Sequence, residues 1–372
     1  MVLGVTLTDF LHLMVKEGAS DLFFSPGSPV MIKVEGISRP IREAHHLTPP
    51  EVQAFAFSLM TENKLKAFES EWEVNLGVSV TELGRFRVNV MRQRGTVAMV
   101  VRYVKSLPPT ITDLNLPASL KSLVMAGRGL VLVAGATGSG KSTTLASMID
   151  YRNSQKHGHI LTIEDPIEFL HSYKKSVVNQ REVGTDTKSY SAALKNAMRE
   201  APDVILIGEI RDEETMRNAI NYSETGHLCL ATIHASNTLE TLDRVINLFP
   251  EAHRKQLLID LSHNLKAVIC QRLIPGVNGK LWPAVEVLSD SPYILDLIQR
   301  DEIDEIREAF ERNLEKEIVT FDQAILSLYD AGRISREMAL LYADSKHNVE
   351  VKIRLKESGS VSTDKINELS IE

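Results

Sequence analysis

Residues 135–142 read Gly-Ala-Thr-Gly-Ser-Gly-Lys-Ser and fit the pattern G-x-x-x-x-G-K-[ST] in full. A continuous apolar run at 130–134 precedes this pattern directly, and a stretch with Leu145, Met148 and Ile149 at helical spacing follows it. In a strand–loop–helix unit of this kind, glycines let backbone N–H groups surround a phosphate at a helix N-terminus. We therefore interpret these residues as a P-loop, which commits the chain to an α/β core around a buried strand.

The P-loop predicts ATP and Mg²⁺ as cofactors. The Lys141 amine is expected to reach the β- and γ-phosphates, and the Ser142 hydroxyl is expected to bind Mg²⁺. The residues predicted to bind the nucleotide are Gly135, Ala136, Thr137, Gly138, Ser139, Gly140, Lys141, Ser142 and Thr143. The alternative is a glycine-rich turn with a solvated lysine, and the flanking strand and helix count against it.

Four short apolar runs suit strands that are buried on both faces of a mainly parallel sheet. They lie at 130–134, 160–163, 204–207 and 228–233. Helical patterns at 215–225 and 253–270 lie between or after these runs. This alternation is typical of an α/β fold, and from about residue 290 onward the pattern becomes helical.

Two adjacent prolines, Pro108 and Pro109, divide the chain, because neither can donate to a strand ladder and both favour extended backbone before them. Residues 1–105, with apolar–polar alternation at 31–34 and 86–91, predict a small α+β domain. The other predicted segments are a linker at 106–117, the P-loop domain at 118–290, a helical region at 291–356 and a disordered tail at 357–372.

Composition excludes several other classes of protein. The chain of 372 residues has two cysteines, Cys229 and Cys270, too few for a disulfide scaffold or a four-cysteine zinc site. No run approaches the roughly 18 apolar residues of a membrane helix, and residues 1–9 lack the pattern of a secretion signal. We therefore expect a cytoplasmic protein, and its net charge of −7 disfavours a protein that coats nucleic acid.

Two carboxylates follow apolar runs at positions that nucleotide hydrolysis requires. Glu209 comes after Gly208 and the run at 204–207, where side chains face the crevice in which open α/β sheets bind ligands. We expect Glu209 to reach Mg²⁺ directly or through water, and the alternative is a plain loop residue. Glu164 follows the run at 160–163 and is the candidate base that activates water, with an ordinary Asp-Pro turn as the alternative.

Histidines flank the run at 228–233. His234 follows the run and is a candidate to sense the γ-phosphate or transfer a proton, while His227 precedes the run. A purely structural histidine is the alternative for both.

Arginines are concentrated at 82–105, where Glu82 is the single acid. The basic residues are Arg85, Arg87, Arg92, Arg94, Arg102 and Lys105. Nucleic acid, an acidic neighbour or the γ-phosphate could be the partner, because guanidinium suits the charge that develops on a transferred phosphate. The alternative is a solvated strand face.

Together these residues resemble the secretion-type hexameric ATPases that drive type II secretion and type IV pili. Residues 135–142 resemble the Walker A box of that family, 162–168 its Asp box, 207–212 its atypical Walker B box and 225–234 its His box. The resemblance covers nearly the whole chain apart from the tail. It implies a homohexamer in which a RecA-like ATPase domain follows a PAS-like N-terminal domain.

Within that family the chain most resembles the PilT/PilU-type retraction ATPases of twitching motility. Residues 19–22 and 84–89 are similar to their N-terminal domain, and the zinc module common in assembly and secretion ATPases is lacking. The resemblance implies that Arg87 and Arg102 close onto the γ-phosphate. It also implies that Arg199 faces a subunit interface.

One segment departs from the autonomous retraction motors. Those motors carry Ala-Ile-Arg-Asn-Leu-Ile-Arg-Glu, whereas residues 293–300 here read Tyr-Ile-Leu-Asp-Leu-Ile-Gln-Arg. The difference points to the accessory PilU type, which works with a PilT-like paralogous motor. The implied partners include a PilC-like platform protein of the inner membrane, so membrane contact would be indirect and at the cytoplasmic face, with no direct nucleic-acid partner.

Three alternatives stay open. The chain could be a pilus-assembly or type II secretion ATPase, because those proteins share every box. It could be a nucleic-acid motor with the same core fold. It could also be a non-hydrolysing partner that binds ATP only to complete the ring of a paralogous motor.

Overall fold

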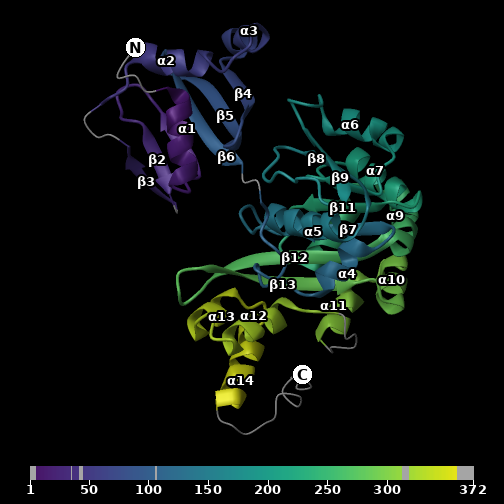
Figure 1. Cartoon of the computed structure of the whole chain (residues 1–372). Coiled ribbons are helices and arrows are strands. Elements are labelled where there is room, and N and C mark those ends of the chain that lie inside the picture. Colours follow the sequence, from purple (N-terminus) through teal and green to yellow (C-terminus); the bar gives the residue numbers. More distant parts are fainter. Residues whose placement is uncertain (1–5, 35, 42–44, 105–106, 312–317, 358–372) are drawn as a thin grey trace. The chain divides into compact units, whose positions relative to one another are not determined.

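The computed structural model describes residues 6–34, 36–41, 45–104, 107–311 and 318–357. The chain divides into two compact units (Figure 1). Unit 1 comprises residues 1–107 with 168–170, and unit 2 comprises 108–167 with 171–372. The predicted tail at 357–372 falls outside the described residues, apart from Glu357. In the described part of the chain, no helix is long and apolar enough to cross a membrane.

Unit 1 is built on a six-stranded antiparallel sheet in the order β3-β2-β1-β6-β5-β4. Its strands are β1 (Asp21–Phe24), β2 (Met31–Val34), β3 (Ile37–Pro40), β4 (Glu73–Val80), β5 (Gly84–Gln93) and β6 (Thr96–Val104). Its helices are α1 (Leu7–Lys16), α2 (Pro49–Phe57) and α3 (Glu62–Glu71). The strands predicted at 31–34 and 86–91 are confirmed as β2 and the middle of β5.

One apolar core joins the sheet of unit 1 to its helices. Phe24, Phe86 and Met99, from three neighbouring strands, are almost completely buried. Phe10 of α1 and Phe55 of α2 pack against the Phe24 ring, with centroids 5.5 and 5.6 Å away. Burial of these large side chains is the main stabilising contribution to the unit.

Unit 2 holds a seven-stranded sheet in the order β13-β12-β7-β11-β10-β8-β9, parallel except for the antiparallel pair β12–β13. Its strands are β7 (Gly129–Ala134), β8 (Gly158–Glu164), β9 (Ser176–Glu182), β10 (Val204–Ile207), β11 (Leu228–Ile233), β12 (Leu265–Pro275) and β13 (Leu281–Ser289). The four apolar runs of the sequence are confirmed as β7, β8, β10 and β11, which form the centre of the sheet. The predicted α/β class is therefore correct.

Helices precede, connect and follow these strands. They are α4 (Ser119–Met125), α5 (Lys141–Gln155), α6 (Tyr190–Ala197), the 3-10 helix η1 (Met198–Glu200), α7 (Glu213–Glu224), α8 (Thr238–Asn247), α9 (Glu251–Asn264), α10 (Pro292–Gln299), α11 (Ile303–Glu311), α12 (Phe321–Asp330), α13 (Arg336–Tyr342) and α14 (Lys346–Glu357). After Ser289 the described elements are all helical, as the sequence pattern indicates.

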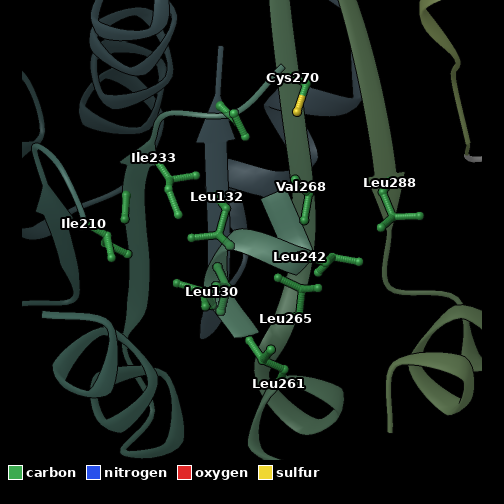
Figure 2. Packing of buried hydrophobic residues seen from close by; sticks show 14 of the residues in the cluster. Leu130, Leu132, Ile210, Ile233, Leu242, Leu261, Leu265, Val268, Cys270 and Leu288 are labelled. Atoms are coloured by element: carbon green, nitrogen blue, oxygen red, sulfur yellow. The ribbon is translucent and has the colours of Figure 1, made fainter. Parts of the chain in front are cut away.

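Alternate residues of β7 enter two separate cores on the two faces of the sheet. Val131 and Val133 join a core with α4 and α5, whereas Leu130 and Leu132 join a larger core with α6 to α14. Figure 2 shows Leu130 and Leu132 close to Val268 and Leu242 in the larger core. Because both faces are covered, the strand reads as a continuous apolar run.

The helix predicted at 253–270 is wrong in its last six residues, 265–270. Helix α9 ends at Asn264, and β12 begins at Leu265 and pairs with β7. Ala267 and Ile269 face one core, while Val268 and Cys270 face the other. A run that is apolar on both sides fits a buried helix as well as a buried strand, so periodicity alone could not separate them.

Candidate functional site

The P-loop connects β7 to α5, as the sequence predicts. Strand β7 ends at Ala134 and α5 begins at Lys141, so residues 135–140 form the loop between them. The Lys141 side chain is buried, and its Nζ donates to the carbonyls of Gly135 (2.7 Å) and Ala136 (3.0 Å). The amine therefore lies within the curve of the loop, where a bound phosphate would meet it.

Glycine is required at both ends of this loop. Gly135 has φ +151°, and a Cβ there would lie 2.6 Å from the carbonyl oxygen of Gln271. Gly140 has φ +89°, and its Cβ would lie 2.7 Å from Nε2 of Gln271. Both positive φ values and both close approaches exclude a side chain.

The residues of the loop fit a nucleotide phosphate with Mg²⁺. Backbone N–H groups gather at the N-terminus of α5, and the buried Ser139 Oγ has no hydrogen-bond partner within the described structure. No group of three or more His, Cys, Asp or Glu residues that could hold a metal occurs among the described residues. Mg²⁺ takes most of its ligands from phosphates and water, and Ser142 and Glu209 are the residues that could hold it.

A cavity of about 290 Å³ adjoins the P-loop. Gly140, Thr143 and Thr144 line it on the side of the loop. Its other walls are mainly apolar and include Leu114, Leu116, Leu273, Leu281, Trp282 and Pro283. No sequence motif marks this cavity, because its walls come from three distant segments.

Three predicted residues follow the carboxyl ends of adjacent strands. Ile163, Ile207 and Ala231 are paired across β8, β10 and β11. Glu164, Glu209 and His234 come at or just after these strand ends and therefore share one edge of the sheet with the P-loop. This is the edge at which open α/β sheets bind ligands.

Glu209 is held by two basic residues. Its Oε1 lies 3.0 Å from Nε2 of His234, and its Oε2 accepts a 2.5 Å hydrogen bond from Nε of Arg211. The carboxylate is 16% exposed, so the two contacts fix its direction while one side stays accessible. His234 and Glu209 thus form a contacting pair, although their motifs are separate in the sequence.

Glu164 is oriented by two neighbours. Its Oε1 accepts from Oγ1 of Thr162 at 2.6 Å and from Nε2 of Gln180 at 3.2 Å. These donors hold the carboxylate at the end of β8.

Gly208 is needed because β8 and α6 approach it closely. A Cβ at this position would lie 2.7 Å from the Tyr190 hydroxyl and 3.0 Å from the carbonyl oxygen of Ile163. Burial, followed by the nearby charge of Asp165, raises the pKa of Tyr190 well above its ordinary value. The Tyr190 hydroxyl therefore stays neutral beside the carboxylates of Glu164, Asp165 and Glu209. No sequence motif marks Tyr190, since only the packing of α6 brings it there.

Arg87 and Arg102 lie side by side in unit 1. They are directly paired across β5 and β6. Nε of Arg102 donates to Oδ1 of Asp21 at 2.7 Å, and the Asp21 carboxylate is almost fully buried, whereas Arg102 remains largely exposed. The two predicted arginines therefore form one basic pair that Asp21 partly neutralises.

His227 and Arg199 lie at the other edge of the sheet of unit 2. His227 precedes β11, and Arg199 belongs to η1, which precedes β10. Oγ1 of Thr225 contacts Sδ of Met198 at 4.0 Å, so the two segments are neighbours. Because the P-loop follows the opposite ends of these parallel strands, the structure does not bring either residue to the P-loop of the same chain.

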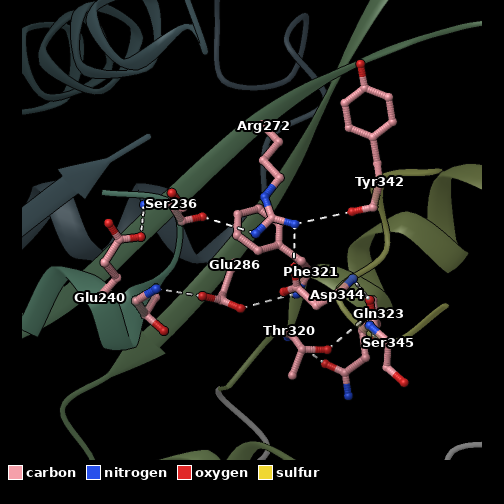
Figure 3. A network of polar contacts seen from close by, with 12 residues as sticks. Ser236, Glu240, Arg272, Glu286, Thr320, Phe321, Gln323, Tyr342, Asp344 and Ser345 are labelled. Carbon is pink, nitrogen blue, oxygen red and sulfur yellow. Dashed lines mark hydrogen bonds and ion pairs between the residues drawn. The ribbon is translucent and has the colours of Figure 1, made fainter. Parts of the chain in front are cut away.

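A polar network around Arg272 of β12 reaches the C-terminal helices (Figure 3). Its guanidinium donates to the Ser236 carbonyl at 3.1 Å and to Oδ1 of Asp344 at 2.6 Å. It also lies 3.8 Å from the Phe321 ring centroid. Nearby, buried Glu286 accepts from the backbone N–H groups of Thr238 and Phe321. The segment after β11 is thereby tied to the C-terminal helices.

Comparisons with known proteins identify the family of the chain. Residues 5–354 match the family described as Type II/IV secretion system protein. The chain is 46% identical over 346 residues to the type IV pilus ATPase PilU of Pseudomonas aeruginosa, covering 93% of this chain and 90% of that protein. It is 42% identical over 333 residues to the retraction ATPase PilT of the same organism, covering 90% and 96%.

A solved structure gives the same result at the level of the fold. The crystal structure of the pilus retraction motor PilT with bound ADP has a TM-score of 0.86 and 38% identity, covering 92% of this chain and 98% of that chain. Together with the family match, these likenesses span both units. The chain therefore belongs to the Type II/IV secretion system protein family.

Proposed function

We propose that this chain is an ATP-hydrolysing motor that powers type IV pilus retraction. The observation that carries the proposal is the meeting of the P-loop, Glu164 and the Glu209–His234 pair at one edge of the sheet. The likeness to the retraction ATPase PilT supports retraction as the task.

Each residue at this edge has a distinct part in hydrolysis. Lys141 binds the phosphates, and Ser142 and Glu209 would hold Mg²⁺, which would neutralise phosphate charge. Glu164 takes a proton from the attacking water, and His234 orients the carboxylate of Glu209. The mainly apolar cavity beside Thr143 suits a nucleotide base.

The remaining predicted residues act between parts of the assembly. In this proposal Arg87 and Arg102 close onto the γ-phosphate, because paired guanidiniums stabilise charge on a transferred phosphate. A role for Arg199 and His227 in nucleotide binding requires a neighbouring subunit, since both lie at the opposite edge from their own P-loop. The proposed assembly is a homohexamer at the cytoplasmic face of the inner membrane, acting on a PilC-like platform protein.

We further propose the accessory, PilU-type role alongside a PilT-like motor. Helix α10 (Pro292–Gln299) carries most of the segment that departs from the autonomous motors. The identity to PilU over nearly the whole chain supports this role.

A pilus count tests the proposal in cells whose only copy carries Lys141→Ala. Fluorescence microscopy should show abundant pili that fail to retract, whereas the exposed-lysine control Lys195→Ala should behave as the parent. Cells without pili would contradict retraction and indicate an assembly ATPase. Normal retraction would direct the test to the accessory role, with the same count repeated after the P-loop of the main motor is disabled.

Purified protein tests the choice of base. Glu164→Gln should bind ATP but hydrolyse it about a hundredfold more slowly or worse. Asp150→Asn is a matched control, because Asp150 of α5 pairs with Lys174 and has no part in the proposed chemistry. Wild-type hydrolysis by Glu164→Gln would exclude Glu164 as the base.

A further inference from the structure

Gln271 stands beside the P-loop because β12 extends beyond β7. Cys270 pairs with Ala134, the last residue of β7, and β12 continues to Pro275. Side chains of a strand alternate between its faces, so Gln271 follows Ala267 and Ile269 toward α5. Its side chain is 3% exposed.

The Gln271 amide joins the loop to the helix that follows it. Its Oε1 accepts from Oγ1 of Thr144 at 2.6 Å, and its Nε2 donates to the carbonyl oxygen of Ser139 at 2.7 Å. Thr144 is also completely buried. One side chain therefore satisfies a loop carbonyl and a hydroxyl in the first turn of α5.

Gln271 also limits the path of the loop by direct contact. A Cβ at Gly135 would lie 2.6 Å from the carbonyl oxygen of Gln271, and a Cβ at Gly140 would lie 2.7 Å from its amide nitrogen. Both outer glycines of the motif thus pack against this one residue.

We propose that Gln271 is a positioning residue for nucleotide binding. It acts through the Ser139 carbonyl and Thr144, because both polar ends of its amide are already engaged by them. Loss of the amide leaves a buried carbonyl and a buried hydroxyl without partners, and the loop gives up the curvature that places its N–H groups around a phosphate. The inference rests on the proposed function of the P-loop as an ATP site.

Equilibrium titration with a fluorescent ADP analogue tests this role in the full chain. Gln271→Leu keeps the side-chain volume and should weaken ADP binding by about tenfold. Gln256→Leu, an exposed glutamine on α9 that pairs with Asp260, is the matched control and should bind as the parent does. Parental affinity in a folded Gln271→Leu protein would overturn the inference, whereas no ADP binding by the parent would instead refute the proposed function.

Gln271→Glu separates positioning from general loss of stability. Its carboxylate can still accept from Thr144 but cannot donate to the Ser139 carbonyl, while the protonated acid can do both. The ADP affinity of this variant, divided by that of the parent at each pH, should therefore recover as pH falls. The same ratio for Gln271→Leu should stay flat. A flat ratio for Gln271→Glu would contradict the role of the donated hydrogen bond.

A double-mutant cycle gives an independent check. Thr144→Val removes the hydroxyl that Gln271 accepts from, so the double variant with Gln271→Leu should lose less affinity than the two single losses combined. Thr144→Ser keeps a hydroxyl and should rescue most of the loss seen in Thr144→Val. Full additivity would show that the two residues act independently and would overturn the proposed linkage.

Discussion

Nε2 of His234 lies 3.0 Å from Oε1 of Glu209, and each residue follows the end of one of two adjacent parallel strands. Arg211 holds the other carboxylate oxygen at 2.5 Å. Both carboxylate oxygens of Glu209 are therefore held by neighbouring side chains. In the proposed mechanism, such preorganisation means that little rearrangement is needed at the moment of reaction.

Replacing His234 with Gln should reduce kcat for ATP hydrolysis by roughly tenfold or more while changing KM little, because the imidazole contacts the carboxylate of Glu209. Steady-state kinetics measure both constants. His253→Gln is the matched control, since His253 lies 3.4 Å from Glu213 in a similar pair on the surface. A rise in KM alone would show that His234 serves binding instead.

Gly208→Ala should destabilise unit 2, because its Cβ would lie 2.7 Å from the Tyr190 hydroxyl and 3.0 Å from a backbone carbonyl. We expect the free energy of unfolding to fall by roughly 1–3 kcal/mol, as measured by denaturant titration. Gly127→Ala is the control, because a Cβ there meets nothing within 4 Å. Adding Tyr190→Phe should restore part of the loss, and no restoration would argue against the Tyr190 contact as a cause.

Glu286 should make stability depend on pH. Burial raises the pKa of its carboxyl above the ordinary value of about 4.3, despite the N–H of Thr238. The folded protein therefore binds this proton more tightly than the unfolded chain does. The resulting stability is complete at low pH and is lost as pH rises through the folded pKa.

Glu286→Gln removes this titration. The free energy of unfolding of the variant, minus that of the parent, should increase as pH rises from about 4 toward neutrality. Glu213→Gln should show the opposite trend, since the hydrogen bond from Arg217 lowers the pKa of Glu213. Denaturant titrations from about pH 2 to neutrality measure both differences, because the Glu213 change lies below the ordinary Glu pKa of about 4.3. Parallel curves for the two variants would refute the assignment.

Arg272→Lys should loosen the C-terminal helices. Lysine retains the charge but loses the planar donor set that reaches Ser236 and Asp344, as well as the stacking on Phe321. We expect a loss of roughly 1–2 kcal/mol and faster hydrogen exchange in α12 to α14. Arg354→Lys, in an exposed pair with Glu350, should leave exchange nearly unchanged. If hydrogen exchange in α12 to α14 were unchanged in Arg272→Lys, the prediction that Arg272 links these helices to β12 would be contradicted.

The sequence predicts this fold best where one residue pattern has one structural solution. The run at 130–134 is bounded by a P-loop, so strand β7 and helix α5 could be placed without knowledge of packing. The run at 265–270 has no such boundary and is apolar on every side, which made a helix as plausible as a strand. Only its pairing with β7 decides the matter.

The candidate site divides in the same way. Lys141 and Glu209 stand at motif positions, so their chemistry could be expected from residue type and spacing. Tyr190 and Gln271 belong to no pattern, because a tyrosine opening a helix or a glutamine inside a strand is common in proteins. Their importance comes from contacts between segments far apart in the chain, which a single sequence does not contain.

Strand β12 owes its register to two polar side chains. Gln271 faces α5 and Arg272 faces the C-terminal helices, because neighbouring side chains point to opposite faces. The apolar residues at 267–270 would remain buried after a slip of one residue, since both faces of the sheet are covered there. A one-residue slip would instead turn Gln271 toward the C-terminal helices and Arg272 toward α5, where neither side chain would find its present partners. The apolar core thus holds β12 in the sheet, and these two polar residues favour one register of its pairing over the register shifted by one residue.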